Sequence, residues 1–222
     1  METKDLICSI NNFEANIVFD KNRSYREIAN GQSPFFFTPV EKGERKRYEK
    51  SENKNEFTST TAAIHIMDSS VEEIEKLFKL DDSGIYEYTC KMIRPYCKGV
   101  VDIKIGLVLF QFLHEVGHWN QFMSLDKNVA AYTTWNYEQE KNNYEKMRAL
   151  KDSVLQRQAR EKDNRLSAEE RMLFRQYTEE YRNIPKEKEA DEFALSYLKE
   201  TIDKYRDCLL YTSPSPRDRQ KS

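Results

Sequence analysis

The chain has no apolar run long enough to cross a bilayer, because a membrane-spanning helix needs about 20 consecutive apolar residues. Its longest candidate, IGLVLFQFL at residues 105–113, is much shorter and contains a glutamine. The N-terminal stretch METKDLICSINNF has neither the basic end nor the apolar stretch of a signal peptide. We therefore expect a soluble, cytoplasmic protein that has no membrane partner.

An excess of charge of one sign is also missing. The sequence has 36 Lys and Arg residues and 38 Asp and Glu residues, so its net charge is −2. Proteins that bind nucleic acid directly usually carry a clear positive excess, and we expect no such contact here. Apolar residues make up only 38% of the 222 residues and charged residues 33%. This composition indicates one domain whose core is concentrated in a few segments.

Cysteine is sparse and shows no C-x-x-C pair, because the four residues are Cys8, Cys90, Cys97 and Cys208. Reduced thiols are the expected state. A metal site or a disulfide formed by Cys90 and Cys97 is the weaker alternative, since two isolated thiols fit no zinc-finger spacing.

The end of the chain resembles a translated sequencing adapter. CLLYTSPSPRD at residues 208–218 matches, residue for residue, one translated frame of a transposon-end sequencing adapter. We therefore expect residues 208–222 to be an artefact rather than native sequence, and residues 1–207 to form a single domain.

The remaining chain predicts a mixture of short strands and longer helices. Alternating or β-branched apolar residues indicate strands in EANIVF, SPFFFTPV and TAAIHIMD, at residues 14–19, 33–40 and 61–68. SVEEIEKLFKL at residues 70–80 begins with a capping box and predicts an amphipathic helix. Residues 41–58 are nearly all polar and predict a solvated loop, and residues 84–104 suggest further strands with uncertain bounds.

Three more helical regions follow. IGLVLFQFLHEVGHWNQFMSL is apolar nearly all round at its start, which predicts a buried helix; Gly117 within it indicates close approach of a neighbouring backbone. Residues 136–183 predict an inserted, charged helical hairpin, more readily a solvated projection than a coiled-coil dimer arm; a lid or partner-binding arm over the active cleft is a further alternative. A final helix begins near Pro185. The expected fold class is α+β, with a small antiparallel sheet packed on the buried helix.

The stretch HEVGH places two of the three histidines of the chain, His114 and His118, four residues apart. On a helix, both imidazoles then share one face and can bind one metal ion. Glu115 lies about 100° around the helix, where it can act as general base on a metal-activated water. H-E-x-x-H on a helix is the zinc hydrolase arrangement, so we expect one Zn²⁺ per chain.

The third ligand must come from elsewhere in the chain. The pattern H-E-x-x-H-x-x-G-x-x-H is excluded because Gln121 and Ser124 stand at the required glycine and histidine. In the helix after Pro185, Glu187 lies roughly 30° and Asp191 roughly 70° from the centre of the apolar stripe. We therefore predict that Glu187 is the third ligand and that Asp191 accepts the ring N–H of a ligand histidine. Alternatively, Glu187 is only a first-turn acid that interacts favourably with the helix dipole.

The stretches HEVGHW and EKEADEFALSYL together resemble the ImmA/IrrE-like group of the gluzincin zinc metallopeptidases. The resemblance implies that His114, His118 and Glu187 are zinc ligands and that Glu115 is the general base. It also implies a small α+β domain in which the active-site helix lies beside a short sheet. Members are often encoded on mobile elements or in stress regulons, and they cleave or disable a DNA-bound repressor. The chain departs from the family in the long insertion before Glu187 and in having no recognisable helix-turn-helix segment.

The favoured function is therefore a zinc-dependent endopeptidase that acts on a protein or peptide, possible targets being a regulator or repressor. The developing oxyanion needs a second donor, which the sequence does not single out among the thirteen tyrosines; Tyr181 and Tyr197 are named only for their proximity to the Glu187 segment. The alternative is a non-catalytic, metal-stabilised protein-binding module of a phage or mobile element. A phage structural or regulatory protein with a fortuitous motif is a weaker third hypothesis, and the oligomeric state is left open.

Overall fold

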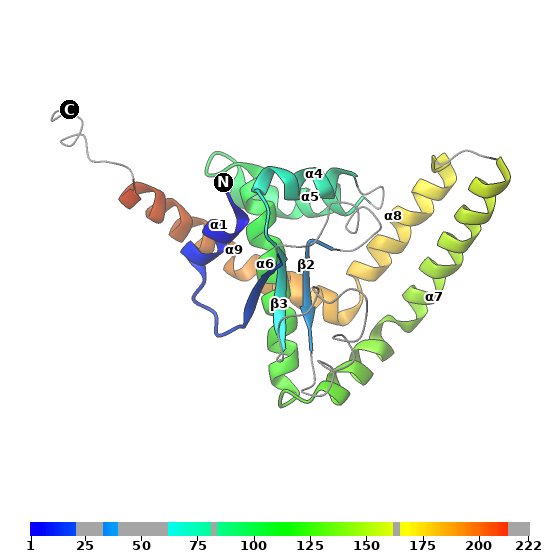
Figure 1. The fold of residues 1–222 in the computed structure, drawn as a ribbon, viewed down its shortest axis with the longest axis horizontal. Helices are drawn as coiled ribbons and strands as arrows, with labels where there is room; N and C mark the ends of the chain where they lie inside the picture. Colours follow the sequence, from blue (N-terminus) through cyan, green and yellow to red (C-terminus); the bar gives the residue numbers. More distant parts are fainter. Residues whose placement is uncertain (21–32, 40–61, 81–83, 162–164, 213–222) are drawn as a thin grey trace.

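The structure is a computed structural model that describes residues 1–20, 33–39, 62–80, 84–161 and 165–212 (Figure 1). The predicted loop at 41–58 and the end of the adapter-like tail lie outside these residues. The elements in chain order are α1 (Thr3–Ile10), β1 (Ile17–Asp20), β2 (Phe35–Thr38), β3 (Ala63–Met67), α4 (Val71–Leu80), α5 (Ile85–Cys97), α6 (Ile103–Ser124), α7 (Val129–Glu161), α8 (Ala168–Arg182) and α9 (Pro185–Thr212).

The fold is α+β, as predicted, with a small sheet of three strands in the order β1-β3-β2. The sheet is mixed, however, because β2 pairs antiparallel and β1 pairs parallel with the central strand β3. The expectation of an antiparallel sheet was therefore wrong for one of the two strand pairs. A period-two pattern specifies which side chains face the core, but it does not specify the neighbour or direction of a strand.

Helix α6 forms the centre of the molecule (Figure 1). Asp102 caps its N-terminus by accepting a hydrogen bond from the backbone N–H of Lys104 at 3.1 Å. Every residue from Ile105 to Trp119 is buried, because α4, α5, α9 and two strands pack around the helix. Burial on all sides explains why the sequence is apolar nearly all round the helix.

Gly117 lies where α6 crosses α9. A Cβ atom at this position would stand 2.8 Å from the Cα of Ala190 and 3.1 Å from its Cβ. The prediction that a neighbouring backbone closely approaches Gly117 is therefore confirmed. Since His118 follows Gly117 and Glu187 is one turn from Ala190, this contact also sets the spacing between the two halves of the candidate site.

Gly117→Ala should lower the free energy of unfolding by about 1–3 kcal/mol, the usual cost of forcing extra atoms into a packed core. The loss will be visible as a lower midpoint in urea unfolding. Ala190→Gly in the same chain should recover part of it, since one of the two clashing atoms is then removed. Helix propensity alone predicts that Gly117→Ala would be about 1 kcal/mol more stable than wild type. That result would contradict the close contact.

Two helices were not predicted. Residues 85–97, where we expected strands, form α5, and residues 3–10 form α1. The buried positions of α5 are Thr89, Cys90, Ile93 and Cys97, which have the three- and four-residue spacing of a helix. The aromatic and β-branched residues of this segment favoured strands by composition, but the spacing of its buried positions was the better guide.

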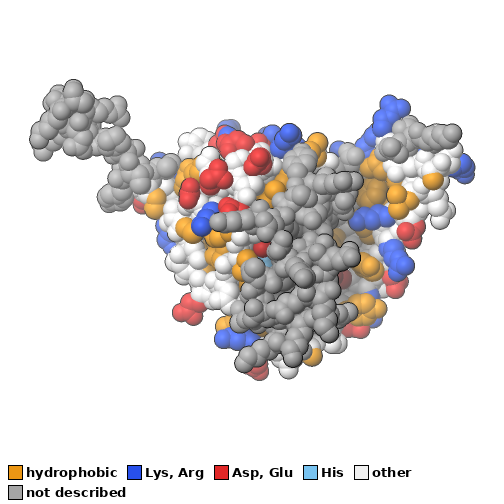
Figure 2. Space-filling model, in the orientation of Figure 1, with side chains coloured by type: hydrophobic (Ala, Val, Ile, Leu, Met, Phe, Trp, Pro, Cys, Tyr) orange, Lys and Arg blue, Asp and Glu red, His pale blue; other side chains and the backbone are white. Residues whose placement is uncertain are grey.

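The predicted capping boxes and hairpin are present. Glu73 accepts from the backbone of Ser70 at the start of α4, and Ser167 and Glu170 form a reciprocal capping box at the start of α8. Helices α7 and α8 lie side by side and project from the rest of the fold (Figure 1). Side chains of both charges are interspersed on the visible face of this hairpin (Figure 2). None of the described helices is long and apolar enough to span a membrane.

Candidate metal centre

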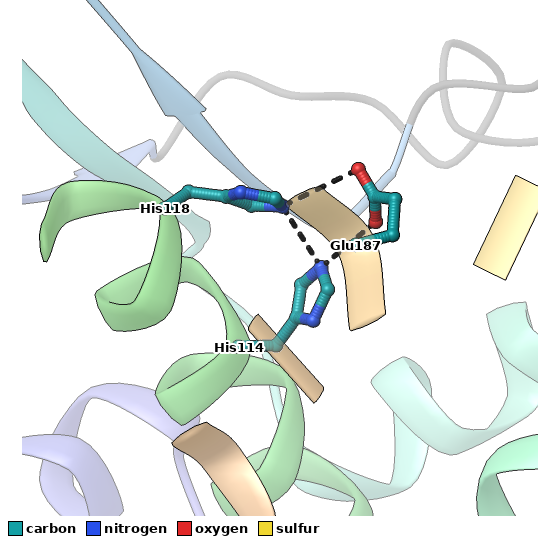
Figure 3. A group of neighbouring side chains, drawn as sticks. All are labelled: His114, His118 and Glu187. Carbon is teal, nitrogen blue, oxygen red and sulfur yellow. Dashed lines mark hydrogen bonds and ion pairs between the residues drawn. The ribbon is translucent and has the colours of Figure 1, made fainter. Parts of the chain in front are cut away.

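Two imidazoles and a carboxylate converge where α6 meets the first turn of α9 (Figure 3). The Nε2 atoms of His114 and His118 are 3.0 Å apart. Glu187 Oε2 lies 3.3 Å from His114 Nε2, and Glu187 Oε1 lies 3.5 Å from His118 Nε2. All three residues are buried, and within the described part of the chain they form the cluster of potential metal ligands, with ligand atoms within 4.8 Å of one another.

The opposite nitrogen of each imidazole is held by its own partner. His114 Nδ1 lies 3.0 Å from Asp191 Oδ1, and His118 Nδ1 lies 2.8 Å from Gln121 Oε1. The amide nitrogen of Gln121 in turn donates to the carbonyl oxygen of Lys186 at 2.7 Å. Acceptors on the Nδ1 side place the ring proton there and leave the Nε2 lone pair free for a metal. The structure thus places Asp191 where the sequence predicted it, and adds Gln121.

The three side chains fit a zinc ion. Zinc binds imidazole nitrogen and carboxylate oxygen at about 2.0–2.2 Å with tetrahedral geometry, which separates the ligand atoms by about 3.3–3.6 Å. The two distances from Glu187, 3.3 and 3.5 Å, lie in this range, and the 3.0 Å between the two Nε2 atoms is slightly shorter. Three protein ligands leave a fourth position for water or substrate, as in catalytic rather than structural zinc sites.

Glu187 is surrounded by hydrogen-bond donors as well as by the two imidazoles. Tyr181 donates its hydroxyl to Glu187 Oε1 at 2.7 Å, Lys186 Nζ lies 3.0 Å from the same oxygen, and Arg182 Nη1 lies 3.4 Å from Oε2. Burial alone would raise the pKa of Glu187, but His118 and His114 hold this pKa well below its usual range. The carboxylate is therefore ionised at neutral pH, as a metal ligand must be.

Arg182 is the main residue of the site that sequence reasoning missed. This buried side chain, at the end of α8, donates through Nε and Nη2 to the two oxygens of Asp191. Burial and the charge of Arg182 lower the pKa of His114, but the hydrogen bonds that Asp191 and Glu187 accept from this imidazole outweigh them and raise the pKa overall. The hairpin is thus part of the site, because Arg182 orients the carboxylate that orients His114. The position of Arg182 shortly before Pro185, where the third-ligand helix begins, was the feature of the sequence that could have pointed to it.

The convergence point opens into a cleft of about 810 Å³. Glu115 lies in its wall and is 7% exposed, so the predicted general base is accessible from the cleft. Tyr132 of α7 lines the same cleft, and its pKa is raised by burial and then by Glu115, Glu187 and Glu140. Its hydroxyl therefore keeps its proton at neutral pH and can serve as a donor.

Of the two tyrosines that were suggested as carbonyl donors, one lines the cleft and the other does not. Tyr181 lines the cleft, and burial followed by the charges of Glu187 and Glu140 raises its pKa well above the usual value. Tyr197 is 41% exposed and packs on Phe193 and Phe13, away from the cleft lining. Tyr181 therefore remains a candidate donor, whereas Tyr197 is unsuited to the role.

The third histidine and the two buried cysteines lie elsewhere. His65, on the central strand β3, is fully buried, and its Nδ1 lies 3.2 Å from Asp20 Oδ2. Cys90 and Cys97 are buried free thiols of α5. None of the three belongs to the metal-ligand cluster found among the described residues.

Comparison with protein-family models, with curated proteins and with solved structures found no match to this chain.

Proposed function

We propose that this protein is a zinc-dependent endopeptidase that hydrolyses a peptide bond in a protein partner. The observation that carries the proposal is the convergence of His114 Nε2, His118 Nε2 and the Glu187 carboxylate, with Glu115 in the wall of the same cleft. A purely structural zinc site usually has four protein ligands and needs no base beside it. This arrangement favours the peptidase over the non-catalytic metal-stabilised binding module.

A zinc ion at this centre would polarise the scissile carbonyl and lower the pKa of a bound water to near 7. Glu115 accepts a proton from the attacking water and passes it to the leaving amine. Tyr132 donates a hydrogen bond to the carbonyl oxygen as negative charge develops there, or Tyr181 does so after releasing its hydrogen bond to Glu187. Asp191 and Gln121 keep both imidazoles in the orientation that directs Nε2 to the centre.

A peptide substrate suits the surroundings of the site. The cleft is bordered by β2, which in the described part of the chain pairs with a single neighbour, β3. An edge strand offers backbone donors and acceptors to an extended peptide. The resemblance of HEVGHW and EKEADEFALSYL to the ImmA/IrrE-like peptidases supports a regulator or repressor as the target.

The proposal is tested first by the metal content of the full chain. The protein, purified under reducing conditions without added metal and without chelator, should carry one zinc per chain when measured by mass spectrometry. The zinc-loaded chain should then cleave members of a mixed peptide library. No metal binding after zinc addition and dialysis would reject the proposal. Stoichiometric zinc without cleavage of any peptide or protein substrate would leave the binding module as the better function.

Zinc affinity should rise with pH, because protons compete with the metal for the Nε2 lone pairs. Below the pKa of His114, this competition should weaken zinc binding by about tenfold per pH unit. Because the pKa of His114 lies above the ordinary value of 6.5, the weakening should begin at a higher pH than for a free histidine. Titration with a competing chelator between pH 5 and pH 8 measures this, and an affinity independent of pH would exclude histidine ligands.

A further inference from the structure

Gln111 is a polar residue in the most apolar part of the chain. It lies on α6 one turn before the candidate centre, three residues before His114 and four before Glu115, so all three share a face of the helix. Its side chain is 5% exposed and lines the cleft. Its Nε2 atom is buried without a hydrogen-bond partner among the described residues. Among the described residues, a few other buried hydroxyl groups also lack a hydrogen-bond partner, but Gln111 is the residue of this group that lines the cleft.

The cleft also has an apolar wall. Leu77 and Phe78 of α4, Ile85 of α5 and Phe35 of β2 line it, and α4, α5 and β2 all pack on α6. A buried amide donor that lacks a partner lowers stability, so its presence in a cleft that also has an apolar wall calls for an explanation. A ligand group that accepts its hydrogen bond would supply one.

The two cationic side chains that line the cleft in the described part of the chain already have acidic partners. Arg182 is paired with Asp191 and Glu187, and Lys186 is paired with Glu140 and Glu187. An acidic ligand side chain beside Gln111 would therefore lose its hydration without gaining a free cation. An apolar side chain would leave Nε2 unpaired. A neutral side chain with an apolar stem and a terminal acceptor satisfies both the wall and the donor.

We propose that Gln111 and this apolar wall form a substrate side-chain subsite that selects glutamine. Two carboxamides are self-complementary, because each offers an N–H donor and a carbonyl acceptor. The inference rests on the proposed peptidase function in that it assigns the substrate class of the same cleft. It concerns binding, however, and is measured separately from hydrolysis.

The test uses zinc-loaded full-length Glu115→Gln protein, so that bound peptide is not turned over. Acetylated and amidated hexapeptides of glycine and alanine carry one glutamine or one methionine at each of the six positions, and calorimetry gives their dissociation constants. Methionine has a similar length but lacks the amide. At one position glutamine should bind about five- to tenfold more tightly, the contribution of one hydrogen bond to a buried neutral donor.

Adding Gln111→Leu should abolish or reverse this preference, whereas Gln156→Leu, an exposed change on the hairpin, should keep it. Equal binding of glutamine and methionine at every position, a preference that survives Gln111→Leu, or no peptide binding would overturn the subsite.

Thermal unfolding supplies a second test. Gln111→Leu should unfold at the same or a higher temperature than wild type, because it removes an unpaired donor, and a fall of several degrees would show a structural partner and overturn the proposal.

Hydrolysis of the same peptides by the wild-type chain separates the two proposals. A preference for glutamine without cleavage supports the subsite and counts against the peptidase. Cleavage that is indifferent to glutamine supports the peptidase and overturns the subsite.

Discussion

Replacing Glu187 with alanine should remove zinc from the chain. Removal of a side chain that hydrogen-bonds to a metal ligand typically weakens zinc binding by roughly 10–100-fold. Loss of an anionic ligand itself should weaken it by more. The two imidazoles would remain with Arg182 and Lys186 beside them, and these cations contact Glu187 in the structure. Without the carboxylate, their positive charge opposes a divalent ion. Equilibrium dialysis against buffered zinc, followed by mass spectrometry, measures the loss.

The matched control for this experiment is Glu192→Ala. Glu192 lies on the same helix α9 but is exposed and outside the cluster, so its removal should leave zinc binding unchanged. Circular dichroism of each variant shows whether the fold is retained. Full retention of zinc by folded Glu187→Ala would mean that the third ligand is a different residue.

Glu115→Gln should keep its zinc and lose its hydrolytic activity. The amide occupies nearly the same volume but cannot accept a proton from water, and removal of a positioned general base typically slows a reaction by about 10²–10⁴-fold. The measurement pairs zinc content with single-turnover cleavage of the best peptide from the library.

Glu145→Gln, an exposed change on α7, controls for loss of one negative charge and should cleave at the wild-type rate. Undiminished cleavage by Glu115→Gln would remove Glu115 from the mechanism. Loss of zinc together with activity would instead give Glu115 a role in holding the metal.

The sequence predicted much of the candidate site because helices repeat every 3.6 residues. That period placed His114 and His118 on one face, and it directed Glu187 and Asp191 towards the core. The structure buries both carboxylates and brings them to His114. Gln121 could have been found in the same way, since it follows His118 by one turn of α6.

Arg182 could not be found by periodicity. It lies at the end of α8, and its contacts to Asp191 and His114 depend on how the hairpin returns to α9. The same return places Tyr181 against Glu187 and brings Lys186 to Glu140 of α7. These contacts join α7, α8 and α9, whose packing follows from the tertiary fold rather than from any one helix. The hairpin, predicted as a solvated insertion, therefore also builds one wall of the cleft.

Local patterns in the sequence were sufficient for the α+β class, for the central buried helix on which His114 and His118 share a face, and for the close approach at Gly117. They were insufficient for the parallel pairing of β1 with β3, for α5, and for the buried ion pairs around Glu187. The physical reason is the range of the interactions. Capping, helical periodicity and the steric demand of glycine act within a few residues, so the sequence shows them directly. Strand neighbours and buried charge pairs join segments that are distant in sequence, and they are set only when the whole core packs.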